Sequence, residues 1–217
     1  ELTDDERVVL ETAACVGGSF WPELVTSLYR AHLDHNETVQ SYWEDSAVDA
    51  RVDELLESLE RKDMVRRRDG DASVPASEEY YFKHRLEREA LYEELDAQTR
   101  QRHHRLIAQW LERVLGDDNR ASAETIARHY DEAHALDKAA EKYIQAADFA
   151  FTHYANQQAV DLYTKGLSYL NDADIGLKMH AFHDLGTVYS MLGEHDQALA
   201  YFREMLRYSW LLNDVSK

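Results

Sequence analysis

Cysteine, proline and glycine are scarce in this chain. Its 217 residues include one cysteine, two prolines and eight glycines. Because proline and glycine disfavour helix interiors, their scarcity predicts a mainly α-helical protein. The single cysteine, Cys15, excludes a disulfide within the chain, and its neighbours are small and apolar, so we expect a buried side chain rather than a reactive thiol. This cysteine usage favours a cytoplasmic location.

Long apolar runs and an excess of basic charge are also missing. No apolar stretch approaches the roughly 20 residues of a membrane span, and residues 1–9 lack the basic start and apolar centre of a signal peptide. We therefore expect no membrane partner. Acidic residues number 42 against 24 lysines and arginines, for a formal charge of −18. A field of that sign repels phosphate backbones, so we expect no nucleic-acid partner.

Helix signals dominate the first half. Thr3 or Asp4 can cap a first helix that Gly17 ends, and Pro22 is suited to the first position of a second. A third helix is predicted by apolar residues at i, i+3, i+4 and i+7, namely Val52, Leu55, Leu56 and Leu59. Residues 32–47, between the second and third helices, are polar and irregular and predict a loop.

A β-hairpin is predicted next, with strands at Met64–Arg68 and Tyr80–Lys83 and a tip containing Asp-Gly and Pro75. Three helices followed by a hairpin is the order of a winged helix. Further amphipathic helix follows until residues 116–119 break the pattern. We therefore predict a winged-helix-like domain with following helices over residues 1–117 and a second domain over 118–217.

The second half of the sequence contains a repeated pattern of apolar and small residues. Residues 179–210 carry the offsets of a tetratricopeptide repeat, a helix hairpin of about 34 residues; these are Phe182, Leu185, Gly186, Tyr189, Ala198 and Phe202. The same offsets recur upstream at Ile126, Ala127, Tyr130, Ala139, Tyr143 and Ala146. A third match, around Ala159, covers half a repeat, at a spacing that predicts one helix shared by two neighbours. We expect an irregular tetratricopeptide α-solenoid that lacks a polar end cap, as in a segment of a longer protein.

These features together resemble a family. The motif F-x-H-x-L-x-R-E-x-x-Y is met by Phe82, His84, Leu86, Arg88, Glu89 and Tyr92. With the winged-helix order before it and the repeats behind it, the chain resembles the segment after the ATPase module in signal-transduction ATPases with numerous domains, the STAND class. More narrowly, it is similar to large bacterial regulators in which this ATPase precedes tetratricopeptide repeats, often fused to a cyclase, a Ser/Thr kinase or a LuxR-type domain.

The resemblance implies a role for His84. In the STAND class a histidine that opens a winged-helix helix touches the phosphates of ADP in the resting state. Here Arg85 follows His84 where the family has Asp, so that part of the contact departs from the family pattern. A structural histidine at a helix end is the alternative. The ATP-binding loop G-x-x-x-x-G-K-[ST] does not occur in the sequence, so ATP or ADP is implied for the full-length protein and no cofactor for this chain.

Other candidate sites are weaker. The basic cluster of residues 61–68 suggests a DNA-binding wing, but acidic residues on the presumed recognition helix oppose it, and docking on the missing ATPase module fits better. His180 and His183 share a helix face, yet the pattern supplies no third ligand, so no metal site is predicted. The concave face of a repeat array suits a peptide, protein or small effector; candidate contacts are Tyr130, Tyr154, Asn156, His183 and Tyr208. Asn156 is alternatively a helix cap.

The sequence therefore predicts a non-catalytic regulatory segment of a larger signalling ATPase. Its expected partners are its own ATPase module and an unidentified protein or small-molecule effector on the repeats. One alternative is a constitutive tetratricopeptide interaction scaffold, which needs no switching. Another is a DNA-binding regulator that uses the winged helix. No catalytic residue is predicted, because no nucleophile or acid–base motif stands out.

Overall fold

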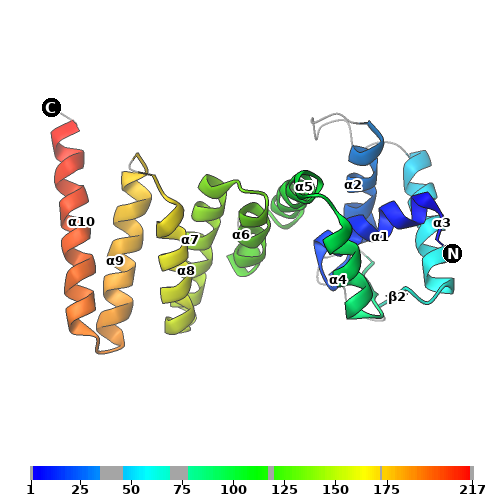
Figure 1. The fold of residues 1–217 in the computed structure, drawn as a ribbon. Coiled ribbons are helices and arrows are strands. Elements are labelled where there is room, and N and C mark those ends of the chain that lie inside the picture. The colour runs from blue at the N-terminus through cyan, green and yellow to red at the C-terminus, as the bar shows by residue number, and fades with distance from the viewer. Residues whose placement is uncertain (1, 35–45, 69–77, 117–119, 172, 216–217) are drawn as a thin grey trace. The chain divides into compact units, whose positions relative to one another are not determined.

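The computed structural model describes residues 2–34, 46–68, 78–116, 120–171 and 173–215 (Figure 1). These residues form ten α-helices and three short strands, which confirms a mainly α-helical protein. The chain divides into two compact units, Glu1–Val114 and Leu115–Lys217. The predicted hairpin tip and most of the predicted loop at 32–47 lie outside the described residues.

Five helices and a small sheet make up the first unit. In chain order its elements are α1 (Asp4–Val16), β1 (Ser19–Phe20), α2 (Pro22–Asp34), α3 (Ser46–Arg61), β2 (Val65–Arg67), β3 (Tyr80–Phe82), α4 (Arg85–Glu94) and α5 (Ala97–Leu115). The antiparallel sheet has the order β1-β3-β2. The predicted hairpin is present as β2 and β3, whereas β1 was not expected from the sequence.

The start of α1 is fixed by a reciprocal cap. The Thr3 hydroxyl accepts a hydrogen bond from the Glu6 backbone N–H, and a Glu6 carboxylate oxygen accepts one from the Thr3 N–H. Glu6 is buried, and it also accepts hydrogen bonds from Ser58 and Lys62 on the α3 side. The bond from Lys62, together with the Thr3 backbone, lowers the pKa of Glu6 to about 2. Local capping and packing against α3 therefore use the same carboxylate.

The buried interior of this unit includes one thiol and two imidazoles. Cys15 is buried, as expected, and burial raises the pKa of its thiol to about 12. Its sulfur lies 3.7 Å from Nδ1 of His103 on α5. Burial also lowers the pKa of His103 and His104 to about 4, because both rings lose the hydration that would stabilise their charged forms. The Tyr92 hydroxyl lies 3.0 Å from His104 Nε2.

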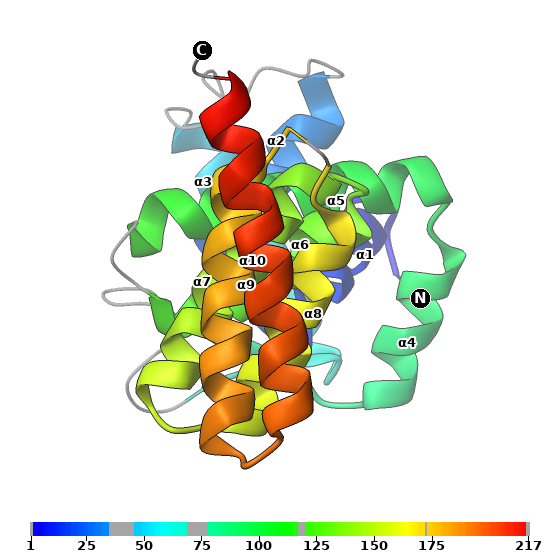
Figure 2. The same cartoon turned by 90° about the vertical axis from the view of Figure 1, so that its left-hand side faces the viewer.

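Helices alone form the second unit in the described residues. A short 3₁₀ turn at Arg120–Ser122 leads into α6 (Ala123–Glu132), α7 (Leu136–Thr152), α8 (Asn156–Tyr169), α9 (Ile175–Met191) and α10 (His195–Val215). Helix α7 packs against both α6 and α8. Helices α9 and α10 run side by side and are joined by a tight turn (Figures 1 and 2).

Three of the turns in this unit share one backbone feature. The α6–α7, α7–α8 and α9–α10 turns each contain a residue with positive φ, at His134 (53°), Tyr154 (60°) and Gly193 (81°). Glycine adopts this left-handed conformation without steric cost, whereas for histidine and tyrosine the Cβ atom makes it unfavourable. The turn after α7 also corrects one prediction: α8 begins at Asn156 itself, and Ala155 is the residue before it, so Asn156 does not cap the helix.

Two glycines allow close helix packing in this unit. A Cβ built on Gly186 would lie 2.7–2.9 Å from three ring atoms of Phe202, across the α9–α10 pair. A Cβ on Gly166 would lie 2.9 Å from Ile144 Cγ1 and 3.2 Å from the Ala140 carbonyl oxygen. All of these distances are shorter than an ordinary van der Waals contact. Glycine at these two positions therefore allows the helices to approach as they do.

Candidate functional site

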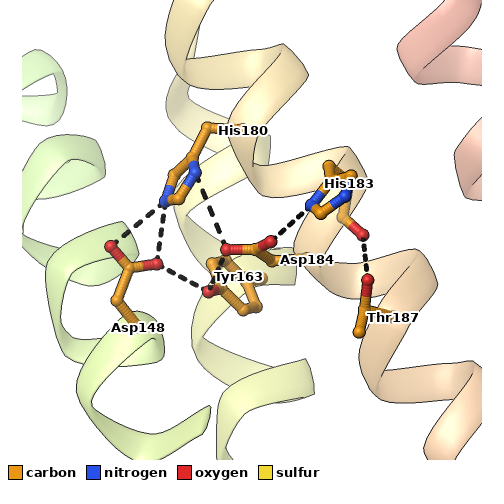
Figure 3. A network of polar contacts seen from close by, with 6 residues as sticks. All are labelled: Asp148, Tyr163, His180, His183, Asp184 and Thr187. Atoms are coloured by element: carbon orange, nitrogen blue, oxygen red, sulfur yellow. Dashed lines mark hydrogen bonds and ion pairs between the residues drawn. The ribbon is translucent and has the colours of Figure 1, made fainter. Parts of the chain in front are cut away.

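A polar cluster joins α7, α8 and α9 within the second unit (Figure 3). Asp148 comes from the last part of α7, Tyr163 from α8, and His180, His183 and Asp184 from α9. His180 and Asp184 are four residues apart, so the helix places them on one face. Asp148 meets them only because α7 and α9 approach each other in the fold.

The carboxylates and the His180 imidazole are in direct contact. His180 Nε2 lies 2.9 Å from Asp148 Oδ1 and 3.1 Å from its Oδ2. The other ring nitrogen, Nδ1, lies 3.6 Å from Asp184 Oδ2. The His180 side chain is 44% exposed, against 24% for Asp148 and 16% for Asp184. One imidazole thus bridges two partly buried carboxylates and remains open to solvent on one side.

Tyr163 contacts both carboxylates through its hydroxyl (Figure 3). Its hydroxyl lies 2.6 Å from Asp148 Oδ1 and 3.2 Å from Asp184 Oδ2, and these two oxygens are the acceptors for its hydrogen bond. Burial and then the hydrogen bond to Asp148 raise the pKa of Tyr163, because a phenolate here would face two negative charges. Tyr163 therefore stays protonated and acts as a hydrogen-bond donor.

His183 contacts the far side of Asp184. Its Nδ1 lies 2.6 Å from Asp184 Oδ1, and its backbone carbonyl accepts a hydrogen bond from the Thr187 hydroxyl (Figure 3). The sequence pattern paired His180 with His183 as neighbours on a face. The structure instead gives each histidine a contact with Asp184.

A second tyrosine–aspartate cluster in the same unit differs in charge. Asp131 accepts hydrogen bonds from the hydroxyls of Tyr143 and Tyr169, and Lys165 Nζ lies 2.7 Å from its Oδ2. Burial opposes ionisation of Asp131, yet the hydrogen bonds from Lys165 and the two tyrosines lower its pKa. Here a lysine neutralises the carboxylate. Within the described residues, the hydrogen-bond and ion-pair neighbours of Asp148 and Asp184 are instead histidines and a tyrosine.

His84 lies in the first unit at the junction of β3 and α4. It is the residue before the first turn of α4, it is exposed, and its side chain makes no capping hydrogen bond within the described residues. The basic residues on either side of it form ion pairs, Lys83 with Asp63 and Arg85 with Glu89. All ten residues of α4 are described and none is fully buried; Leu86 is 77% exposed.

The candidate partner contacts, all of which lie in the second unit, differ widely in exposure. Tyr130 is fully buried and Tyr208 nearly so, which makes both rings part of helix packing. Tyr154 is 80% exposed at its turn, and His183 is exposed on α9. Asn156 is partly buried, and its Oδ1 has no hydrogen-bond partner in the described residues. A surface contact would therefore use Tyr154 and His183 rather than the two buried tyrosines.

The basic cluster near the sheet is paired with acids. Lys62 binds Glu6, Arg66 binds Asp63, Arg67 binds Glu78, and Arg68 binds Glu79. A pocket of about 550 Å³ lies close by, lined mostly by carboxylates that include Glu23, Asp49 and Asp53. Burial and then its acidic neighbours raise the pKa of Asp53. This surface is therefore poorly suited to a phosphate or nucleic-acid backbone.

None of the described helices combines the length and the apolar composition that crossing a bilayer requires. Comparison of the chain with protein-family models and with curated proteins finds no match.

Proposed function

We propose that this chain is a non-catalytic regulatory segment of a larger cytoplasmic signalling ATPase of the STAND class. In this proposal a winged-helix-like unit relays the nucleotide state of the ATPase module through His84, and a tetratricopeptide array binds a partner protein or small effector. The observation that carries the proposal is the exposed β3–α4 junction, where His84 opens a helix whose residues are all at least partly accessible.

The order of elements in the first unit supports a winged-helix-like assignment. Helices α1, α2 and α3 precede the β2–β3 hairpin, and β1 adds a third strand beside β3. The arginines of the hairpin side are paired with carboxylates. That pairing favours docking on another protein over insertion into a nucleic-acid groove.

The packing of the second unit supports a tetratricopeptide-like assignment. Successive helices form hairpins through tight turns, and a small residue lies at the close approach of α9 and α10, at Gly186. The exposed ring of Tyr154 lies at one of the turns. Stacked hairpins of this kind present surfaces to peptides or proteins.

The junction at His84 has the chemistry for contact with a phosphate-bearing neighbour. An imidazole donates a hydrogen bond to a phosphate oxygen in either protonation state. The side chain of Leu86, two residues on, offers apolar surface to the same neighbour. A nucleotide can shift the arrangement of the domains only if the junction binds one nucleotide state more tightly than the other.

The test uses the full-length protein that carries this segment, with His84→Ala compared with wild type. His195→Ala is the matched control, since His195 is also exposed and also opens a helix, α10. The nucleotide that co-purifies with each protein is quantified, and the rate of ADP release is measured. We expect His84→Ala to release ADP faster and to raise basal output, with the control unchanged. ADP retention and basal output equal to wild type would remove the sensor role.

A constitutive interaction scaffold is the second candidate, favoured by an apolar stripe on α10. Leu199, Leu206 and Trp210 are exposed by 53%, 49% and 72%, and their spacing of seven and four residues places them on one helix face. A scaffold predicts that the affinity of the full-length protein for its partner is the same with ATP and with ADP. A regulatory segment predicts that the two affinities differ.

A further inference from the structure

Three side chains of the polar cluster carry donor atoms of the kinds that ligate metal ions. Asp148, His180 and Asp184 each offer one ligand atom, and these three atoms all lie within 4.8 Å of one another. One imidazole nitrogen with two carboxylate oxygens suits a first-row transition ion better than Mg²⁺ or Ca²⁺, which prefer oxygen alone. We propose that a divalent transition ion of the Zn²⁺ class binds here and joins α7 to α9.

The distances are close to those of a four-coordinate zinc site. Zinc bonds of about 2.0–2.2 Å place tetrahedral ligand atoms roughly 3.3 Å apart. His180 Nε2 is already 2.9 Å from Asp148 Oδ1 and 3.1 Å from Oδ2. The widest separation among the three ligand atoms is at most 4.8 Å, so it needs to close by no more than about 1.5 Å to reach the same spacing. Rotation of the His180 side chain, which is 44% exposed, provides a movement of that size.

The charge of the cluster favours a cation. Asp148 and Asp184 together bring two negative charges, and their hydrogen-bond and ion-pair neighbours in the described part of the chain are histidines and Tyr163. In the related cluster a lysine, Lys165, neutralises the single carboxylate of Asp131. A dication between Asp148 and Asp184 would supply the positive charge that Lys165 supplies in that cluster.

Neighbouring side chains hold the two carboxylates in place, and the cluster remains accessible to an ion from solvent. The Tyr163 hydroxyl contacts both carboxylates, and His183 Nδ1 contacts the Asp184 oxygen that faces away from His180. Outer hydrogen bonds of this kind orient ligating side chains in metal sites. The 44% exposure of His180 gives solvent access to the cluster, so water can complete the coordination.

The test measures Zn²⁺ binding to the full 217-residue chain after dialysis against a chelator. Isothermal calorimetry gives stoichiometry and affinity, and thermal unfolding gives the shift in Tm with Zn²⁺ and, separately, with Mg²⁺. We expect one tight Zn²⁺ per chain, a Tm raised by Zn²⁺ and not by Mg²⁺, and at least about tenfold weaker binding in His180→Ala and Asp184→Asn. His195→Ala, an exposed histidine of α10 outside the cluster, should bind as wild type.

Cobalt absorption provides a readout that needs no variant. Co²⁺ added to the wild-type chain should give the visible bands of four-coordinate cobalt, and Zn²⁺ should displace it. Absence of these bands together with a Tm insensitive to Zn²⁺ would overturn the proposal, and the cluster would then be a metal-free ion pair bridged by His180. Equal Zn²⁺ affinity in wild type and His180→Ala would also overturn it, because the metal would lie elsewhere on the chain.

Discussion

Substitution of Gly186 by alanine tests the close packing of α9 on α10. The added Cβ would lie 2.7 Å from Cε1, 2.8 Å from Cδ1 and 2.9 Å from Cζ of the Phe202 ring. An aromatic ring is rigid and cannot bend away locally, so either the ring must change rotamer or the two helices must separate. The matched control is Gly176→Ala in the same helix, where the added Cβ meets no atom within 4 Å.

The expected magnitude comes from two opposing effects. Alanine in place of glycine favours a helix by about 0.5–1 kcal/mol, and overpacking a close contact costs about 1–3 kcal/mol. Gly176 lies in the first turn of α9, so the control gains at most the first effect and does not carry the second. We therefore expect Gly176→Ala to raise the free energy of unfolding by up to about 1 kcal/mol, and Gly186→Ala to lower it by up to about 2 kcal/mol, the net of the two effects.

Urea denaturation followed by far-UV circular dichroism measures both free energies of unfolding. Adding Phe202→Leu to Gly186→Ala should recover part of the loss, because a smaller side chain leaves room for the new methyl group. A Gly186→Ala variant more stable than wild type would refute the reasoning, because the gain in helix preference would then outweigh any cost of the contact with Phe202.

Two further predictions concern the buried imidazoles and the turn after α7. Stability of the 1–114 unit should fall as pH drops from about 6.5 toward 4, because the unfolded chain takes up protons at the ordinary histidine pKa of 6.5, while His103 and His104 in the folded state resist protonation down to about 4. The urea midpoint followed by tryptophan fluorescence should therefore decrease over this range, less steeply in His104→Gln, and an equal slope in wild type and variant would contradict the assignment. Tyr154→Asn should raise the free energy of unfolding by up to about 1 kcal/mol, since Asn tolerates the left-handed backbone at φ 60° and the ring is 80% exposed. Tyr154→Phe keeps the Cβ in the same conformation and should match wild type, and a loss of stability in Tyr154→Asn would show that the ring contributes packing.

The sequence by itself determined the features that depend on local spacing. Scarce proline and glycine, with apolar residues at helical periods, predicted a mainly α-helical chain, and the structure confirms it. Thr3 was predicted as a possible cap because the helix needs an acceptor for its first N–H groups, and it makes that bond. The β2–β3 hairpin followed from two β-rich runs separated by turn residues. Each of these depends on neighbours within a few residues along the chain.

The tertiary structure alone decided which distant side chains meet. Strand β1 is two residues long and forms by pairing with β3, some sixty residues later in the chain. A two-residue strand is too short to show an alternating sequence pattern, so the sequence did not predict it. The sequence paired His180 with His183 on one helix face and supplied no third ligand. Asp148 and Asp184 instead contact His180 through the packing of α7 near α9 and the turn of α9 itself. The burial of Tyr130 likewise depends on which side of its helix the neighbours cover. A helical period fixes the relative directions of side chains, whereas packing between helices fixes what those side chains contact.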